Sequence, residues 1–187
     1  LDKGVLSLLS KAKTKGGFCH LALYELTDAQ LIKAIKALAA KDRLALCLAN
    51  ADTSEEYRDA QGVKHTRKIK DGTNADTREA LHAAGVDVTD RFVPSSSIGH
   101  NKFVVWSNTK GPQEVLTGST NWTATGLCSQ TNNALIIRNA TVAQGYRDYW
   151  DWLVWDAEQK PVQGKDMREW CGAGPVDATV GGASVSV

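Results

Sequence analysis

The stretch RLALCLAN, residues 43–50, decides the fold class of this chain. Its almost continuous apolar character is typical of a strand in a sheet that helices cover on both faces. An amphipathic helix precedes it over residues 27–42, with a capping box predicted from Thr27 and Gln30. A further apolar strand, FCHLALYEL, precedes that helix. Strand, helix and strand in succession predict an α/β layer fold.

The rest of the chain continues this alternation. A helix over residues 1–15 is ended by two glycines, and polar, patternless residues 51–73 predict a long surface loop. Helices are predicted at 75–85 and 141–158, and strands at 86–93, 100–106, 114–118 and 132–139. We therefore expect a mixed central sheet flanked by helices on both faces. This domain would span residues 1–158, and a Gly/Ala/Ser-rich tail or linker would span residues 159–187.

Composition narrows the possible functions. The net charge of +1 creates no global attraction to nucleic acid or to a membrane surface, and no apolar run is long enough to span a bilayer. Cys19 and Cys47 lie in apolar runs, so we expect buried thiols rather than disulfides. One local basic run, VKHTRKIK at residues 63–70, is either a solvated loop or a contact for a phosphate backbone. Cytoplasmic and bacterial secreted settings both fit this composition.

A histidine and a lysine stand two residues apart in IGHNKFVVW, residues 98–106. Side chains alternate between the faces of a strand, so His100 and Lys102 are predicted to point the same way. An imidazole beside an ammonium group suits an oxyanion better than a metal ion. No cluster with zinc-ligand spacing and no P-loop occurs in the sequence.

Neutral hydrogen-bonding groups follow this pair. In TGSTNWT, residues 117–123, Ser119 offers a hydroxyl group and Asn121 offers an amide. Asn132 and Asn133 stand at the mouth of the next predicted strand. The inventory is one candidate nucleophile, one cation and several neutral donors, with no carboxylate dyad.

The combination HNKF, GSTNWT and NNALII resembles the phospholipase D superfamily, whose signature is H-x-K, four residues, an aspartate and then a G-S turn followed by asparagine. The resemblance implies a phosphodiesterase that works without a metal or cofactor. It makes His100 the nucleophile that forms a phosphohistidine, and it makes Lys102 and Asn121 ligands of the phosphate oxygens. It places Ser119, Asn132 and Asn133 at the substrate, with Asn132 where many members carry a glutamate that orients the histidine.

Two features depart from the family pattern. Ser107 occupies the position of the motif aspartate, and the chain contains a single H-x-K motif. The family needs two histidines, one as nucleophile and one as acid for the leaving group. The second motif would come from a homodimer partner or from the second half of a longer protein. Nucleic acid and phospholipid head groups are both open as substrates, and a degenerate half that only binds phosphate is the non-catalytic alternative.

Overall fold

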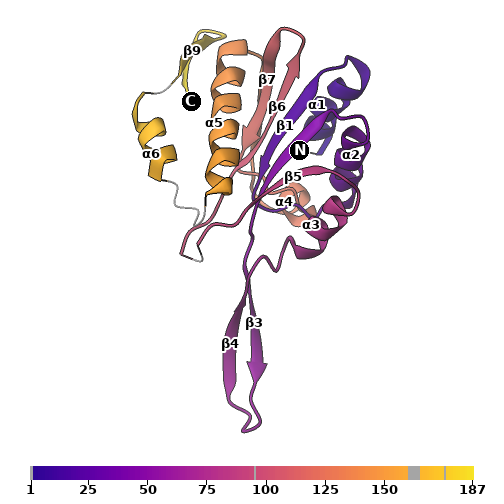
Figure 1. Ribbon diagram of the computed structural model, residues 1–187, viewed down its shortest axis with the longest axis vertical. Coiled ribbons are helices and arrows are strands. Elements are labelled where there is room, and N and C mark those ends of the chain that lie inside the picture. The colour runs from indigo at the N-terminus through magenta and orange to yellow at the C-terminus, as the bar shows by residue number, and fades with distance from the viewer. Residues whose placement is uncertain (1, 95, 160–164, 175) are drawn as a thin grey trace.

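A mixed six-stranded sheet with helices against both faces forms the body of the molecule (Figure 1). The computed structural model describes residues 2–94, 96–159, 165–174 and 176–187. The strand order is β5-β2-β1-β6-β7-β8. β1 pairs in parallel with β2, and β2 with β5, whereas the β1–β6, β6–β7 and β7–β8 pairs are antiparallel. The predicted α/β fold with a mixed central sheet is therefore confirmed.

The elements of the body follow the predicted order, with a short additional helix, α4. The sheet strands are β1 (Phe18–Leu23), β2 (Leu44–Ala49), β5 (Asp87–Arg91), β6 (Lys102–Asn108), β7 (Gly111–Gly118) and β8 (Ala134–Ile137). The helices that precede the C-terminal segment are α1 (Asp2–Thr14), α2 (Ala29–Ala39), α3 (Ala75–His82), α4 (Ala124–Cys128) and α5 (Ala140–Glu158).

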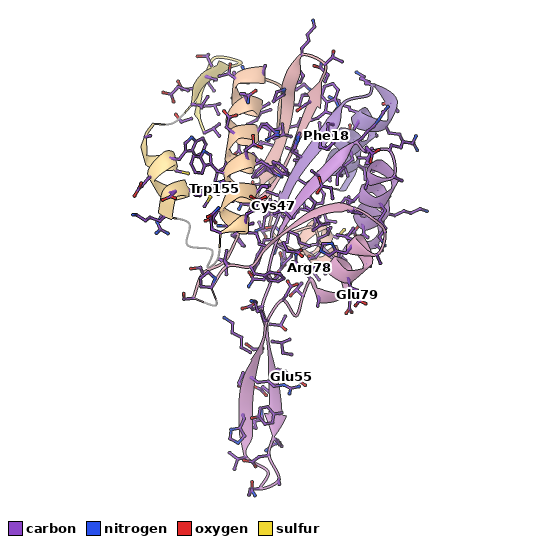
Figure 2. The ribbon with its side chains drawn as sticks, in the orientation of Figure 1. Phe18, Cys47, Glu55, Arg78, Glu79 and Trp155 are labelled. Atoms are coloured by element: carbon purple, nitrogen blue, oxygen red, sulfur yellow. The ribbon has the colours of Figure 1, made fainter. Side chains whose placement is uncertain are left out.

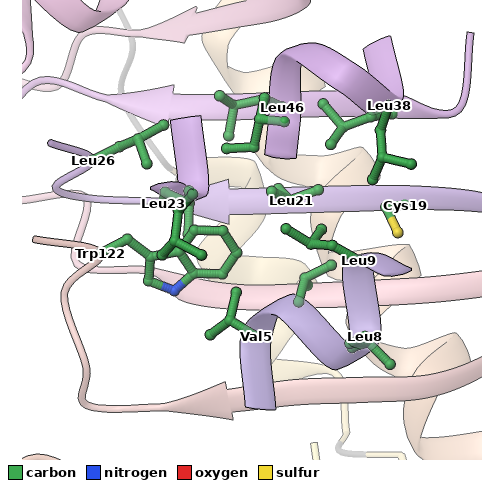
Figure 3. Packing of buried hydrophobic residues seen from close by; sticks show 14 of the residues in the cluster. Val5, Leu8, Leu9, Cys19, Leu21, Leu23, Leu26, Leu38, Leu46 and Trp122 are labelled. Carbon is green, nitrogen blue, oxygen red and sulfur yellow. The ribbon is translucent and has the colours of Figure 1, made fainter. Parts of the chain in front are cut away.

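Alternation along the strands divides the core into two layers. Leu44, Leu46 and Leu48 of β2 face the helices α1, α2 and α3, in the cluster shown in Figure 3. Ala45 and Cys47 face the opposite side, where α5 packs. Burial on both faces explains why β2 reads as a continuous apolar run.

Two local predictions need correction. The cap of α2 is Asp28, whose side chain accepts a hydrogen bond from the backbone N–H of Leu31 at 2.9 Å. The capping box predicted from Thr27 and Gln30 is therefore wrong: the cap lies one residue later, and Leu31 has no side-chain acceptor to complete a box. In addition, β6 begins at Lys102, so His100 lies in the preceding loop and not in the strand.

Residues 51–73 do not form the predicted loop. They contain an antiparallel hairpin of β3 (Thr53–Arg58) and β4 (Lys64–Ile69), which projects away from the body of the molecule (Figure 1). Nearly every residue of both strands is exposed, so no apolar alternation marks them in the sequence. Glu55 lies on this arm, well separated from Arg78 in the body (Figure 2).

The segment after α5 also has regular structure. It contains α6 (Lys165–Gly172) and a small hairpin of β9 (Asp177–Val180) and β10 (Ala183–Ser186). Met167, Ala178 and Val185 pack against the core cluster on the α5 side of the sheet. The described part of this segment therefore contacts the body of the molecule through these side chains.

The cysteines fall into two classes. Cys19 and Cys47 are buried, as predicted, and burial raises the pKa of each thiol to about 12. Cys128 and Cys171 are exposed. No helix in the described part of the chain combines the length and the apolar character needed to cross a membrane.

Candidate phosphate site

Strand register brings the candidate residues to one edge of the sheet. Leu23, the last residue of β1, pairs with Lys102, the first residue of β6. Gly118, the last residue of β7, pairs with Ala134, the first residue of β8. The ends of these four strands, and the loops attached to them, therefore lie side by side.

His100 is exposed at this edge. Its ring lies 5.0 Å from the ring of Tyr24, centroid to centroid, at an interplanar angle of 59°. Partial burial and the charge of Lys102 lower the pKa of the imidazole, while Glu25 opposes this shift. A neutral, nucleophilic ring is therefore present at pH 7.

Lys102 is only 5 % exposed. Its ammonium group donates a hydrogen bond to the backbone carbonyl oxygen of His100 at 3.3 Å and lies 5.1 Å from the centroid of the Tyr24 ring. Burial lowers the pKa of Lys102 to about 8, and the charge of Glu25 acts in the opposite direction. A desolvated ammonium group beside an exposed imidazole gains from a bound anion.

Asn121 follows the turn that leaves β7. Its amide nitrogen Nδ2 donates to Oε2 of Glu25 at 2.5 Å, and its Oδ1 is buried without a hydrogen-bond partner within the described residues. The turn requires Gly118, because a Cβ atom there would come within 2.2 Å of the backbone oxygen of Asn133.

The remaining predicted residues form a second group. The Ser119 hydroxyl donates to Oδ1 of Asn132 at 3.2 Å and accepts from the backbone N–H of Asn133 at 3.0 Å. The Asn132 amide nitrogen also donates to the backbone oxygen of Gly126 at 2.9 Å. These contacts join the start and the end of the connection between β7 and β8. A role for these residues at the substrate stays a prediction.

The structure adds two residues that the motif analysis missed, Tyr24 and Glu25. Both follow β1. The Tyr24 ring lies against His100 and Lys102, and the charge of Glu25 raises the pKa of both groups. The sequence signal that could have found Glu25 is a carboxylate shortly after an apolar strand, at the end of the sheet where the other candidate polar residues lie. Asn74 fixes this segment by accepting from the backbone N–H of Leu26 at 3.0 Å and donating to the backbone oxygen of Tyr24 at 2.7 Å.

Ser107, at the position of the motif aspartate, lies near the other end of β6 from Lys102. The two residues lie five positions apart along the strand, which separates them by about 17 Å. The Ser107 hydroxyl is buried without a hydrogen-bond partner in the described structure, and the backbone oxygen of Ser107 lies where a Cβ atom on Gly17 would stand. The replaced aspartate therefore affects the packing of the far sheet edge and not the composition of the site.

Comparison with known proteins identifies the family to which the chain belongs. Residues 5–154 match the family described as cardiolipin synthase, PLD-like domain. The chain belongs to the phospholipase D-like family. A search of the curated proteins finds no significant match.

Three solved structures share the fold of this PLD-like chain. Nuc from Salmonella typhimurium, a phospholipase D family member, is 21% identical with a TM-score of 0.56, over 80% of this chain and 84% of Nuc. NucT from Helicobacter pylori is 13% identical with a TM-score of 0.54, over 81% of this chain and 86% of NucT. A polyphosphate kinase from Porphyromonas gingivalis is 14% identical with a TM-score of 0.55, over 82% of this chain but only 24% of the kinase.

Proposed function

We propose that this chain is a phosphodiesterase subunit that acts through a phosphohistidine on His100, without a metal ion, at a site completed by a second H-x-K motif. The observation that carries the proposal is the buried Lys102 ammonium group, which has a depressed pKa and lies beside an exposed, neutral imidazole. A phosphodiester repels nucleophiles by its negative charge. A fixed ammonium group and the Asn121 amide offset that charge as it redistributes in the transition state.

The reaction divides into two displacements at phosphorus. A ring nitrogen of His100 attacks, the bond to the leaving oxygen breaks, and a second histidine gives that oxygen a proton. The same second histidine then takes a proton from water, which attacks phosphorus and breaks the P–N bond. His100 is exposed at a sheet edge, so an isologous two-fold axis would bring the equivalent histidine of a second copy to face it. The second half of a longer chain would serve equally.

The charges on the hairpin bear on the choice of substrate class. The basic run of residues 63–70 falls mainly on β4, where Lys64 pairs with Glu56 and Arg67 pairs with Glu55 across the two strands. These exposed pairs support a solvated arm, because their cations already have partners, although such pairs are weak enough for phosphates to compete. The dependence of cleavage on salt concentration distinguishes the two substrate classes. Cleavage of a nucleic acid gripped through several phosphates weakens steeply as salt rises, whereas hydrolysis of a phospholipid follows vesicle surface.

The direct test is trapping the covalent intermediate. With a chromogenic diester such as bis(4-nitrophenyl) phosphate and excess chelator, we expect turnover and an acid-labile phosphoprotein. Both should be lost in His100→Ala and kept in His65→Ala, which removes an exposed histidine on the hairpin arm. An activity that needs a metal ion and survives His100→Ala would refute the mechanism. A protein that binds inorganic phosphate through Lys102 without turnover would instead support the non-catalytic half.

A further inference from the structure

The segment that follows β1 is joined to the turn after β7 by backbone and side-chain contacts. The backbone N–H of Trp122 donates to the backbone oxygen of Glu25 at 3.0 Å, and Leu26 forms a parallel bridge with Trp122. The Glu25 carboxylate accepts from Nδ2 of Asn121 at 2.5 Å. Glu25 therefore has a fixed place beside the amide that the proposed function assigns to the phosphate.

We propose that Glu25 is a positioning residue of this site, whose carboxylate orients the Asn121 amide and supplies the negative charge that faces His100 and Lys102. The proposal rests on the proposed function for its effect on turnover, but the charge arrangement can be tested without any turnover. The substrate itself is not a contact of Glu25 in this scheme, since Glu25 acts through its three neighbours.

The orienting role follows from the hydrogen-bonding capacity of an amide. Nδ2 carries two hydrogens, and one of them is directed at Glu25. The reverse orientation of the amide would place Oδ1 against the carboxylate. Both oxygens carry negative charge, so they repel each other. Glu25 thus fixes which end of the Asn121 side chain is the donor end, and the second hydrogen remains for a phosphate oxygen.

The electrostatic role follows from the groups around the two reactive side chains. Tyr24 presents its ring to both, and Asp52, which follows β2, acts on Tyr24. The positive charge of Lys102 lowers the pKa of His100. Glu25 is the carboxylate that acts on both, and it raises the pKa of each against the effect of burial.

The hydrogen bonds of Asn132 also support the assignment of this role to Glu25. Its side chain is committed to Ser119, Gly126 and Gln130, through one accepted and two donated hydrogen bonds. None of these partners is His100. Glu25, which comes from a different part of the chain, carries the negative charge for the site.

The first test measures the imidazole directly. Glu25→Gln keeps a hydrogen-bond acceptor for Asn121 and removes the charge, whereas Glu25→Asp keeps the charge. We expect an NMR titration to give a lower pKa for His100 in Glu25→Gln than in the wild type. Glu25→Asp should stay nearer the wild type, and Glu79→Gln should match it, because Glu79 is an exposed glutamate on α3 (Figure 2). Equal His100 titration in the wild type and in a folded Glu25→Gln variant overturns the proposal.

The second test uses the pH profile of diester cleavage. In the proposed mechanism His100 must be neutral, whereas the second histidine must be protonated and Lys102 must be charged. The rate therefore falls at low pH through His100 and at high pH through the second histidine, which in a homodimer has the same surroundings as His100, and through Lys102. Removing the carboxylate lowers these pKa values, and both limbs of the profile in Glu25→Gln should therefore move to lower pH. Glu25→Ala also frees the Asn121 amide, and its kcat/KM should fall by about tenfold or more. If Glu25 had only a structural role, its substitution would lower the rate without shifting the limbs of the pH profile.

These outcomes separate the two proposals. If the wild-type chain cleaves no diester, the proposed function fails and the NMR titration still decides the role of Glu25. If the wild type cleaves and the Glu25→Gln profile superimposes on it, the role of Glu25 fails and the phosphodiesterase stands. Circular dichroism on each variant first establishes that it is folded, and Glu25→Asp serves as the second variant should the neutral substitutions unfold the chain.

Discussion

At the scale of single residues, Lys102 combines a cost to stability with the proposed role in phosphate binding. The ammonium group is almost fully buried, and its folded pKa of about 8 lies below its ordinary value of 10.5. Below pH 8 the folded state holds a charge that burial disfavours. Between about pH 8 and pH 10.5 the unfolded chain binds more protons than the folded chain, so stability rises with pH across that window.

Lys102→Met should therefore be more stable than the wild type at pH 7, by up to about 3 kcal/mol, while losing diester cleavage. The advantage should shrink as the pH rises from 8 towards 10, because the wild-type lysine then loses its proton in the folded state. Denaturant unfolding of both proteins at pH 7 and at pH 9.5 measures this difference. A stability gap that is the same at both pH values would contradict the assigned cause.

The sequence predicted part of the candidate site at this scale. His100, Lys102 and Asn121 follow from the spacing of one motif, and the structure gathers them around the same segment. Glu25 lies 96 residues from Asn121 along the chain, so their contact depends on where the β1–α2 connection meets the turn after β7. A local sequence pattern cannot predict a contact between residues so far apart in the chain.

At the scale of elements, Asn74 connects strand ends that carry the site. It is fully buried, and besides its contacts with Leu26 and Tyr24 it donates to the backbone oxygen of Ala49 at 3.0 Å. One side chain thus joins the ends of β1 and β2 just before the helix α3. It also holds the backbone on either side of Glu25.

Asn74→Ala should lower the free energy of unfolding by about 3 kcal/mol, because it leaves buried backbone groups without partners. The loosened segment should also weaken cleavage. Urea denaturation measures the loss, and Asn108→Ala is the matched control, since that asparagine accepts from Lys110 in an exposed turn. The control should change stability by about 0.5 kcal/mol or less. Equal losses in both variants would show that Asn74 holds no special position.

The hairpin arm can be removed as a unit. Its strands contribute almost no buried surface, and its base is closed by the backbone N–H of Asp71, which donates to the Asp52 carboxylate at 2.9 Å. Replacing residues 53–70 with two glycines should keep the melting temperature within about 3 °C and leave cleavage of a small diester unchanged. Differential scanning calorimetry and a chromogenic assay check both. A large fall in melting temperature would mean that the arm packs on the body.

Periodicity predicted the elements that bury a continuous face and missed those that are exposed, half-buried or very short. The strands and helices of the body bury one or both faces, and their apolar spacing predicted them with small errors at the ends. The arm was missed because it is exposed on both faces, and the β9–β10 hairpin because its strands have only alternate, half-buried positions. α4 is five residues long, too short to show a helical period.

At the scale of the whole molecule, the proposed mechanism requires a second imidazole that this chain does not supply beside His100. Turnover should therefore belong to an associated species, whether a homodimer or a complex with a second motif-bearing chain. On dilution, the specific activity should fall in step with dissociation. Analytical ultracentrifugation and activity measured on the same dilution series test this, and full turnover by a monomer would contradict the shared site.

The layer order of the fold was the most predictable property, because a strand buried on both faces implies helices on both sides. The sequence could not supply the position of a second copy. The surfaces that would meet at a two-fold axis are exposed in one chain, and exposure leaves no periodic signal.

The unequal reactivity of the four thiols offers a way to observe that assembly. Maleimide dyes should react with Cys128 and Cys171 and spare Cys19 and Cys47, whose thiols are buried and protonated. Cys128 ends the short helix that follows Asn121, so a fluorophore attached there, in a Cys171→Ser background, would report on the end of the sheet that carries the candidate site. Energy transfer between donor- and acceptor-labelled copies would then report directly on whether two such ends approach each other in solution.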